Sequence, residues 1–348
     1  MFRNGLQVNK LAISLCLAAV TAVGGYGQAP TPRPAQRPSV RVDTPKPTSP
    51  KYYPRPAIAS ADTSESAMEV DPNVFIQFPC ISQAKVTISG WERNEIRVFI
   101  KDGSKMRFRV HEKDPVSDKP KWVLITILAL DGARAPMSDC ISGESIEIDV
   151  PVKASLAIKG YQFETTIDSV KKVEIKNLGG NVALRNISGG ITAATYEGDV
   201  AVENSGGQIS LETSTGNIIA YEVGPGQIGD TFKAKTTNGS VMLQKVDHRQ
   251  IEANSVSGSV TFDGKFLSGG LYNFKTTNGS IKLSIPTDSS FKVIASYGFG
   301  TFNTTFPLKI LTETESPGGK SSVAVMGVGD ASVNVTTSSG SIGIGKQP

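Results

Sequence analysis

Few residues of this 348-residue chain could carry acid–base or metal chemistry. It has two histidines, of which His111 stands in a charged run and His248 follows Asp247, so both are expected to be solvated. A catalytic triad or a zinc site needs a histidine with further polar partners, and neither neighbourhood supplies them. We therefore predict no metal site, no cofactor and no histidine-based catalysis.

Paired carboxylates are the other chemistry to consider, because glycosidases use two acids that flank the bond to be cleaved. Glu197, Asp199, Glu203 and Glu212 cluster in the sequence. If two coils stack in register, Asp199 and Asn217 lie at equivalent corners, which gives a mixed Asp–Asn ladder and no second acid. We interpret these acids as solvated corner residues and keep a polysaccharide-active β-helix enzyme as the alternative.

Cys80 and Cys140 are the two cysteines beyond the apolar N-terminal segment. An oxidising compartment would allow them to pair. In the chain-entropy model, closing a loop of about 60 residues would contribute roughly 4 kcal/mol. Two separate buried thiols are the other interpretation.

A glycine-punctuated repeat organises the chain from residue 170 onward, and its β-forming positions follow at regular intervals. The first apolar positions after each bend are residues 182, 191, 200, 209 and 218, each nine residues after the last. Further along, Val241, Val260 and Ile281 are spaced by 19 and then 21 residues. The spacing predicts coils of 18–21 residues with two strands each.

Tight corners separate these strands, and glycine or Asn-Gly supplies the positive φ that a corner requires. A single coil cannot bury its inner face, so neighbouring coils must stack. We predict an all-β fold, a β-solenoid; an antiparallel β-sandwich or hairpin array is the alternative, because Asn-Gly also favours hairpins. The predicted structural corners are Gly180, Gly198, Gly207, Gly216, Asn238, Gly239, Gly258, Asn278, Gly279 and Gly340.

The segment before the repeats also predicts strands. Residues 74–169 show period-two alternation, as in Glu95–Ile100, with turn residues between the runs. We therefore predict one solenoid domain over residues 74–348, with N-terminal strands at 74–169 and glycine-punctuated repeats at 170–348.

Two sequence motifs resemble those of the bacterial putative-adhesin family, a domain of unknown function in exported proteins. One is the strand Ile88–Val98, with its Gly-Trp-Glu-Arg entry, and the other is the Thr-Thr-Asn-Gly-Ser repeat. The resemblance covers roughly residues 75–345. It implies an extracytoplasmic β-solenoid with a role in adhesion or envelope interaction, and it supplies no catalytic residues.

The N-terminus predicts export. Residues 1–27 combine basic residues, an apolar stretch and small residues, as in a signal peptide. Residues 28–73 are predicted to be a proline-rich, basic, disordered stalk, which is either a spacer or a contact to the anionic envelope. Eight bases and one acid in residues 1–57 leave a net charge of −3 on the rest of the chain, which disfavours nucleic-acid binding.

Tyr297, Phe299, Phe302 and Phe306 gather near the C-terminal end and predict either a cap over the last coil or a small aromatic binding patch. From these observations we predict a noncatalytic exported protein, periplasmic, cell-surface or secreted, acting as an adhesion, binding or structural module. The sequence does not identify a binding partner. The candidates are an envelope polysaccharide and a surface protein.

Overall fold

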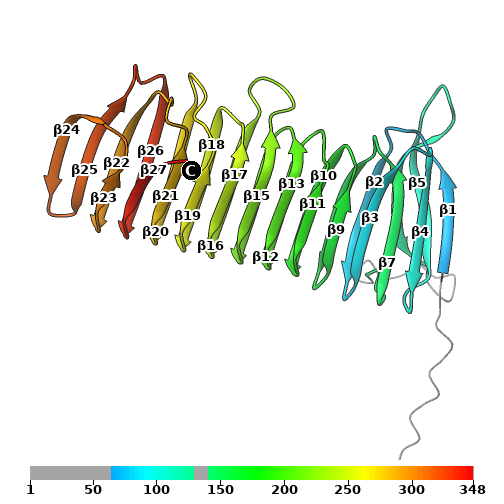
Figure 1. The fold of residues 1–348 in the computed structure, drawn as a ribbon. Helices are drawn as coiled ribbons and strands as arrows, with labels where there is room; N and C mark the ends of the chain where they lie inside the picture. The colour runs from blue at the N-terminus through cyan, green and yellow to red at the C-terminus, as the bar shows by residue number, and fades with distance from the viewer. Residues whose placement is uncertain (1–63, 129–139, 348) are drawn as a thin grey trace, which may run out of the picture. The chain divides into compact units, whose positions relative to one another are not determined.

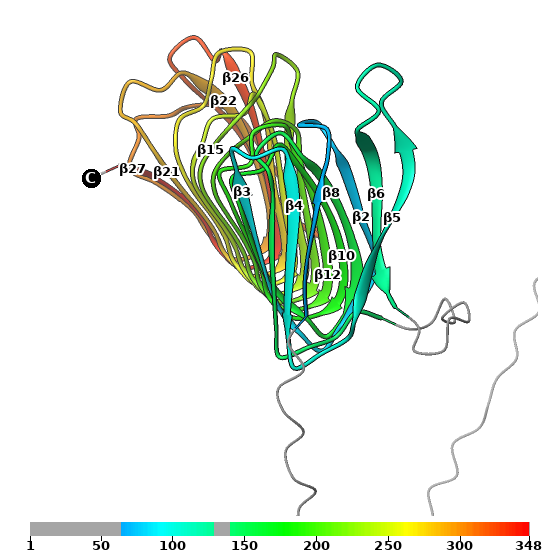
Figure 2. The same cartoon turned by 90° about the vertical axis from the view of Figure 1, so that its right-hand side faces the viewer.

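The computed structural model describes residues 64–128 and 140–347, which all belong to one compact unit of the chain. In these ranges the chain forms 27 strands arranged in two sheets. Figure 1 shows the stack of strands from the side, and Figure 2 shows it from one end. No described helix is long and apolar enough to span a membrane. The predicted signal peptide, residues 1–27, and most of the predicted stalk, residues 28–73, lie outside the described residues.

The strand order of each sheet shows how the chain winds. The first sheet, sheet A, has the order β1 (Ser64–Glu69), β4 (Glu95–Lys101), β7 (Ser145–Pro151), β3 (Lys85–Trp91), β9 (Glu164–Asp168), β11 (Val182–Arg185), β13 (Val200–Gly206), β15 (Ile218–Gly224), β17 (Val241–Val246), β19 (Val260–Asp263), β21 (Ile281–Ile285), β27 (Ile342–Lys346) and β23 (Phe302–Thr304). The second, sheet B, has the order β24 (Lys309–Ser316), β25 (Gly319–Met326), β22 (Phe291–Phe299), β26 (Ala331–Ser339), β20 (Leu271–Asn278), β18 (Gln250–Ser257), β16 (Thr231–Asn238), β14 (Ile209–Thr215), β12 (Ile191–Glu197), β10 (Lys172–Gly179), β8 (Ser155–Tyr161), β2 (Phe75–Ser82), β6 (Pro120–Ile127) and β5 (Met106–Lys113).

Strands β8 to β21 alternate between the two sheets, so each coil contributes one strand to each. Neighbouring coils pair in parallel: Val182 lies beside Val200, and Val200 beside Ile218, a spacing of 18 residues as predicted. The next coil, from Ile218 to Val241, is longer than the predicted range because loop 225–230 is added between β15 and β16. The fold is a β-solenoid, which confirms the predicted class.

Alternate side chains of every coil point between the sheets and form one continuous apolar core. In β13, for example, Val200 and Val202 are buried, whereas Ala201 between them is partly exposed. Burying one such valine or isoleucine stabilises the fold by about 1.5–3 kcal/mol. The core therefore grows with each coil that is stacked.

The last repeat in the sequence is not the last coil in space. Strands β26 and β27 pair with β20 and β21 on one side and with β22 and β23 on the other. Beyond β22, strands β25 and β24 extend sheet B antiparallel. The coil of residues 331–346 is thus internal, and residues 291–326 close the C-terminal end.

The opposite end is closed by antiparallel strands too, since β4 pairs with β1 and β7, and β5 pairs with β6. Hairpin pairing, the alternative drawn from the sequence, describes only these two ends. Strand β1 corrects one boundary, because Ser64–Glu69 lies within the predicted stalk. Its sequence has little β-propensity, and its pairing with β4 and the packing of Met68 on the core explain its order.

The described corners depend on glycine. A Cβ on Gly216 would lie 2.1 Å from the carbonyl oxygen of Gly198 on the neighbouring coil, so stacking leaves no room for a side chain. Seven predicted corner glycines have φ between 97° and 154°, the region that favours glycine: Gly180, Gly198, Gly207, Gly216, Gly239, Gly258 and Gly340.

Three predicted corner residues differ from this description. Asn238 and Asn278 are the last residues of β16 and β20 and do not have positive φ. Gly279 lacks a left-handed φ as well, but a Cβ there would lie 2.1 Å from the Gly258 carbonyl oxygen. The bend itself therefore falls after the asparagine, and close approach explains Gly279.

The opposite corner uses left-handed residues that are not glycine in five successive coils, at Ser169, Asn186, Asn204, Glu222 and Lys245. Asn186 and Asn204 have φ of 54° and 45°, and the Asn204 amide donates to the Asn186 side-chain oxygen at 2.6 Å. The next two coils have Glu222 and Lys245 at this corner, joined by an ion pair of 2.7 Å. Sequence reasoning missed this corner, because only its asparagines are residue types typical of it.

The structure places His248, Cys80 and Cys140 in the interior or in a covalent bond. His248 is fully buried, so the expectation that it is solvated was wrong; it turns inward behind β17 and lies 5.8 Å from the Phe232 ring. Cys80, in β2, and Cys140 form a disulfide with their Cα atoms 4.7 Å apart, beside a bridge between Ile81 and Ile141.

Candidate functional site

A row of buried polar side chains, which we call the ladder, runs across sheet B near the C-terminal ends of its parallel strands. In seven coils, an inward Asn, Thr or Ser near the end of the strand donates to a corner carbonyl of a neighbouring coil; Thr213, for example, donates to Gly198 at 2.9 Å. This satisfies backbone oxygens that would otherwise be buried unpaired. It explains the first threonine of the Thr-Thr-Asn-Gly-Ser repeat. The ladder consists of Asn177, Thr195, Thr213, Thr236, Ser255, Thr276 and Thr337.

The residue that follows each ladder member points outward, because successive side chains of a strand alternate. Since ladder members are register partners, the residues after them line up across the coils. We call this row the lateral track. It consists of the residues that follow the seven ladder members, together with Tyr161, which follows Gly160, the register partner of Asn177 in β8. In order along sheet B these are Tyr161, Leu178, Tyr196, Ser214, Thr237, Val256, Thr277 and Ser338.

One end of the lateral track is apolar. Tyr161, Leu178 and Tyr196 come from β8, β10 and β12, and they are 41%, 65% and 63% exposed. A surface pocket of about 420 Å³ opens beside Leu178 and Tyr196, where the small residues Gly160 and Ala194 leave room. Its polar lining comes from Lys159, Lys176, Asn177, Thr195, Glu212 and Ser214.

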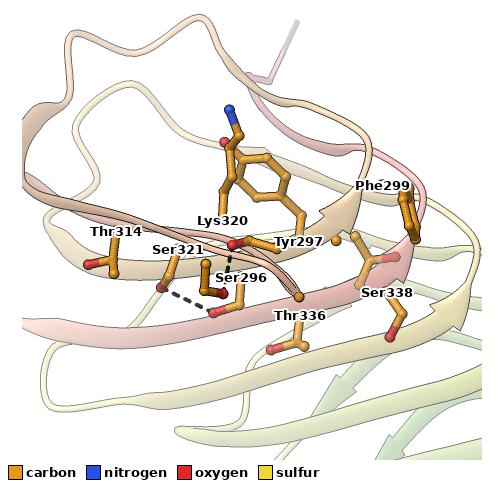
Figure 3. A pocket seen from close by; sticks show the side chains of 13 residues that line it. Ser296, Tyr297, Phe299, Thr314, Lys320, Ser321, Thr336 and Ser338 are labelled. Atoms are coloured by element: carbon orange, nitrogen blue, oxygen red, sulfur yellow. Dashed lines mark hydrogen bonds between the residues drawn. The ribbon is translucent and has the colours of Figure 1, made fainter. Parts of the chain in front are cut away.

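The other end of the lateral track is rich in hydroxyl groups, and a second pocket of about 400 Å³ opens there. Its side chains are seen close up in Figure 3. Thr314, Ser321, Ser296 and Thr336 are register partners on β24, β25, β22 and β26, and the Ser296 and Ser321 hydroxyls lie 3.3 Å apart. Ser338, the last member of the lateral track, lines the same pocket.

The aromatic residues singled out from the sequence divide between the two predicted roles. Phe306 is buried, and Tyr297 and Phe302 pack partly buried against the core, as a cap would. Phe299 is 84% exposed and lines the pocket. In Figure 3 the side chains of Tyr297 and Lys320 point away from the hydroxyl groups of Ser296 and its register partners. Lys320 forms an ion pair with Glu315 at 3.1 Å.

Three of the four acids considered for catalysis have structural partners, namely Asp199, Glu203 and Glu212. Asp199 accepts the Asn217 backbone N–H at 2.7 Å, and Asn181 accepts that of Asp199 at 2.9 Å, so the predicted corner ladder exists. Glu203 pairs with Arg185 at 3.1 Å, and Glu212 with Lys235 at 3.4 Å.

Glu197 lines a corner cleft of about 610 Å³ together with Glu164 and Glu144. Glu144 pairs with Lys101 at 2.8 Å, and this hydrogen bond and the charge of Lys101 lower the pKa of Glu144. Glu144 is therefore ionised at neutral pH and unsuited to act as a general acid. In residues 64–128 and 140–347 no three His, Cys, Asp or Glu side chains converge as a metal site would require.

The fold and its lateral surfaces define a parallel, two-sheet β-solenoid. The model of the Toastrack family, DUF4097, matches residues 67–345, and the chain belongs to this family. A comparison with curated proteins finds no match.

Two solved structures are similar over 82% of this chain. One is a putative cell adhesion protein from Clostridium sporogenes, with 13% identity, a TM-score of 0.26 and 100% of its own chain covered. The other is a putative lipid binding protein from Parabacteroides distasonis, with 12% identity, a TM-score of 0.38 and 97% of its chain covered. At these scores neither carries an argument about this chain.

Proposed function

We propose that this protein is a noncatalytic, exported binding module of the cell envelope or surface, which takes its ligand on the outer face of sheet B. The lateral track carries the proposal. It presents exposed tyrosines at one end and a row of hydroxyl groups at the other, on strands that the hydrogen bonds of the buried ladder link from coil to coil. Such a surface offers aromatic faces and hydrogen bonds, which suit recognition more than proton transfer.

Export is part of this proposal and is supported by the signal-like residues 1–27 and by the disulfide between Cys80 and Cys140, since disulfides persist in oxidising compartments. The basic residues of the segment 28–57 would add a Coulomb attraction to anionic envelope polymers.

Retention on fractionated envelope tests the binding role. The purified protein is mixed with the polysaccharide, membrane-lipid and surface-protein fractions of native cells, and the bound share is measured after centrifugation. We expect retention by the polysaccharide fraction. Retention by none of the three fractions would contradict the proposal.

The competing function is polysaccharide cleavage, and the cleft with Glu164 and Glu197 favours it. Release of reducing ends from a panel of envelope and plant polysaccharides measures it. We expect no release. Turnover by the wild type that disappears in Glu197→Gln or Asp199→Asn would establish an enzyme instead.

A further inference from the structure

We propose that the apolar end of the lateral track binds an extended, β-linked polysaccharide, which lies along the stacking direction of the coils with sugar rings over Tyr161 and Tyr196. The inference rests on the proposed function and names its ligand class. The rings belong to β8 and β12, which are both hydrogen-bonded to β10 between them.

The spacing of the two tyrosines suits such a chain. Their strands are two inter-strand steps apart, about 9.6 Å, which is close to the length of two pyranose rings in an extended β-linked polymer. Leu178 lies between them at the same position of β10. Every second sugar can therefore meet an aromatic ring, and the sugar between can meet the leucine.

The pocket beside Leu178 and Tyr196 offers a sugar ring space, an aromatic face and hydrogen-bonding groups. Gly160 and Ala194 leave space, and the electron-rich faces of tyrosine attract the C–H groups on the apolar face of a pyranose. Glu212 can accept hydrogen bonds from sugar hydroxyls. Lys159 lines the same pocket, has no ion-pair partner among the described residues, and can donate to them.

Stability does not explain the apolar residues. At the same position four other coils have Ser214, Thr237, Thr277 and Ser338, so the fold accepts small polar residues there. The exposed strip is also one residue wide along each strand. A protein partner buries on the order of 800 Å² per side, whereas a single polymer chain matches a narrow strip. Beyond Tyr196, Ser214 and Thr237 extend hydrogen-bonding groups in the same line.

Calorimetric titration of the full chain with oligosaccharides tests this inference. The probes are chitohexaose and cellohexaose, which are β-1,4-linked, with an α-1,6-linked glucose hexamer as the non-extended comparison. We expect at least one β-linked probe to bind and the α-linked probe not to bind. Tyr161→Ala and Tyr196→Ala should each weaken binding about five- to tenfold, whereas Tyr196→Phe should retain it.

Tyr221→Ala is the matched control, because Tyr221 lies on the outer face of sheet A in β15 and contacts Lys245 there. It should bind as the wild type does. Unchanged binding in Tyr161→Ala/Tyr196→Ala, or no binding of either β-linked probe, would overturn the inference. If the double variant is still retained by the polysaccharide fraction of the envelope, the proposed function survives and this site is wrong; loss of retention supports both.

Discussion

The imidazole of His248 illustrates how burial decides the behaviour of a single residue. Its Nε2 lies 2.8 Å from the carbonyl oxygen of Gly207, whereas its Nδ1 is buried without a partner among the described residues. Burial lowers the pKa of His248, because the charged ring would lose its hydration. The Nε2–H tautomer is neutral and donates to Gly207, so the folded state favours it.

This shift predicts a pH-dependent stability. The unfolded chain takes up a proton at His248 near its ordinary pKa of about 6.5, and the folded chain does so only at lower pH. The free energy of unfolding should therefore fall as the pH drops below about 6.5, and level off below the folded pKa. Urea unfolding at pH 7.5 and 5.0 measures the change. In His248→Gln, which keeps a donor for the Gly207 carbonyl, the fall should be smaller; an equal fall would refute this role of His248.

Corners are the elements on which stacking depends. At Gly216 the backbone has φ of 151°, and a Cβ would meet the carbonyl oxygen of Gly198 at 2.1 Å. At Gly224, at the end of β15, a Cβ would meet nothing within 4 Å, and φ is not positive. The backbone conformation and the neighbouring coil therefore require glycine at position 216, whereas neither requires it at position 224.

Gly216→Ala should destabilise the fold by about 3 kcal/mol, because strain and the steric contact act together. Gly224→Ala should change the free energy of unfolding by less than about 1 kcal/mol. Both are measured by thermal and urea unfolding. Equal losses in the two variants would show that close coil contact does not restrict the corner.

At the scale of the whole described unit, the edge strands of the two sheets determine whether the solenoid remains monomeric. Strand β24 is exposed along its length and pairs only with β25. Such an edge can recruit another chain unless charges oppose it. Glu313 and Glu315 alternate along β24 and supply those charges.

Replacing both acids, as Glu313→Val/Glu315→Val, should therefore produce dimers and larger species, because the variant edge is apolar and β-prone. Analytical ultracentrifugation over a range of concentrations measures this. The matched control is Glu174→Val/Glu212→Val, on β10 and β14, which are paired on both sides. Association of the control to the same extent would point to general hydrophobicity and not to the edge.

The sequence by itself determined the repeating part of this fold. The glycines before Val182, Val200 and Ile218 and the alternation after them are local signals, and one coil is made of local choices that the next coil repeats. Two strands per coil, the inward apolar set and the Asp199–Asn217 ladder follow from that repetition. The left-handed Glu222 and Lys245 left no such signal, because their residue types are common on any surface.

Only the tertiary structure decided the rest. The insertion of residues 331–346 between two earlier coils and the pairing of β1 with β4 depend on contacts between strands that are separated in sequence. The inward turn of His248 depends on its contacts with Phe232 and Gly207 from other parts of the chain. The lateral track is of the same kind, since Tyr161, Leu178 and Tyr196 become neighbours only when three coils are stacked. Residues far apart in sequence can form one surface only when the coils between them have set the register, and no local pattern encodes that.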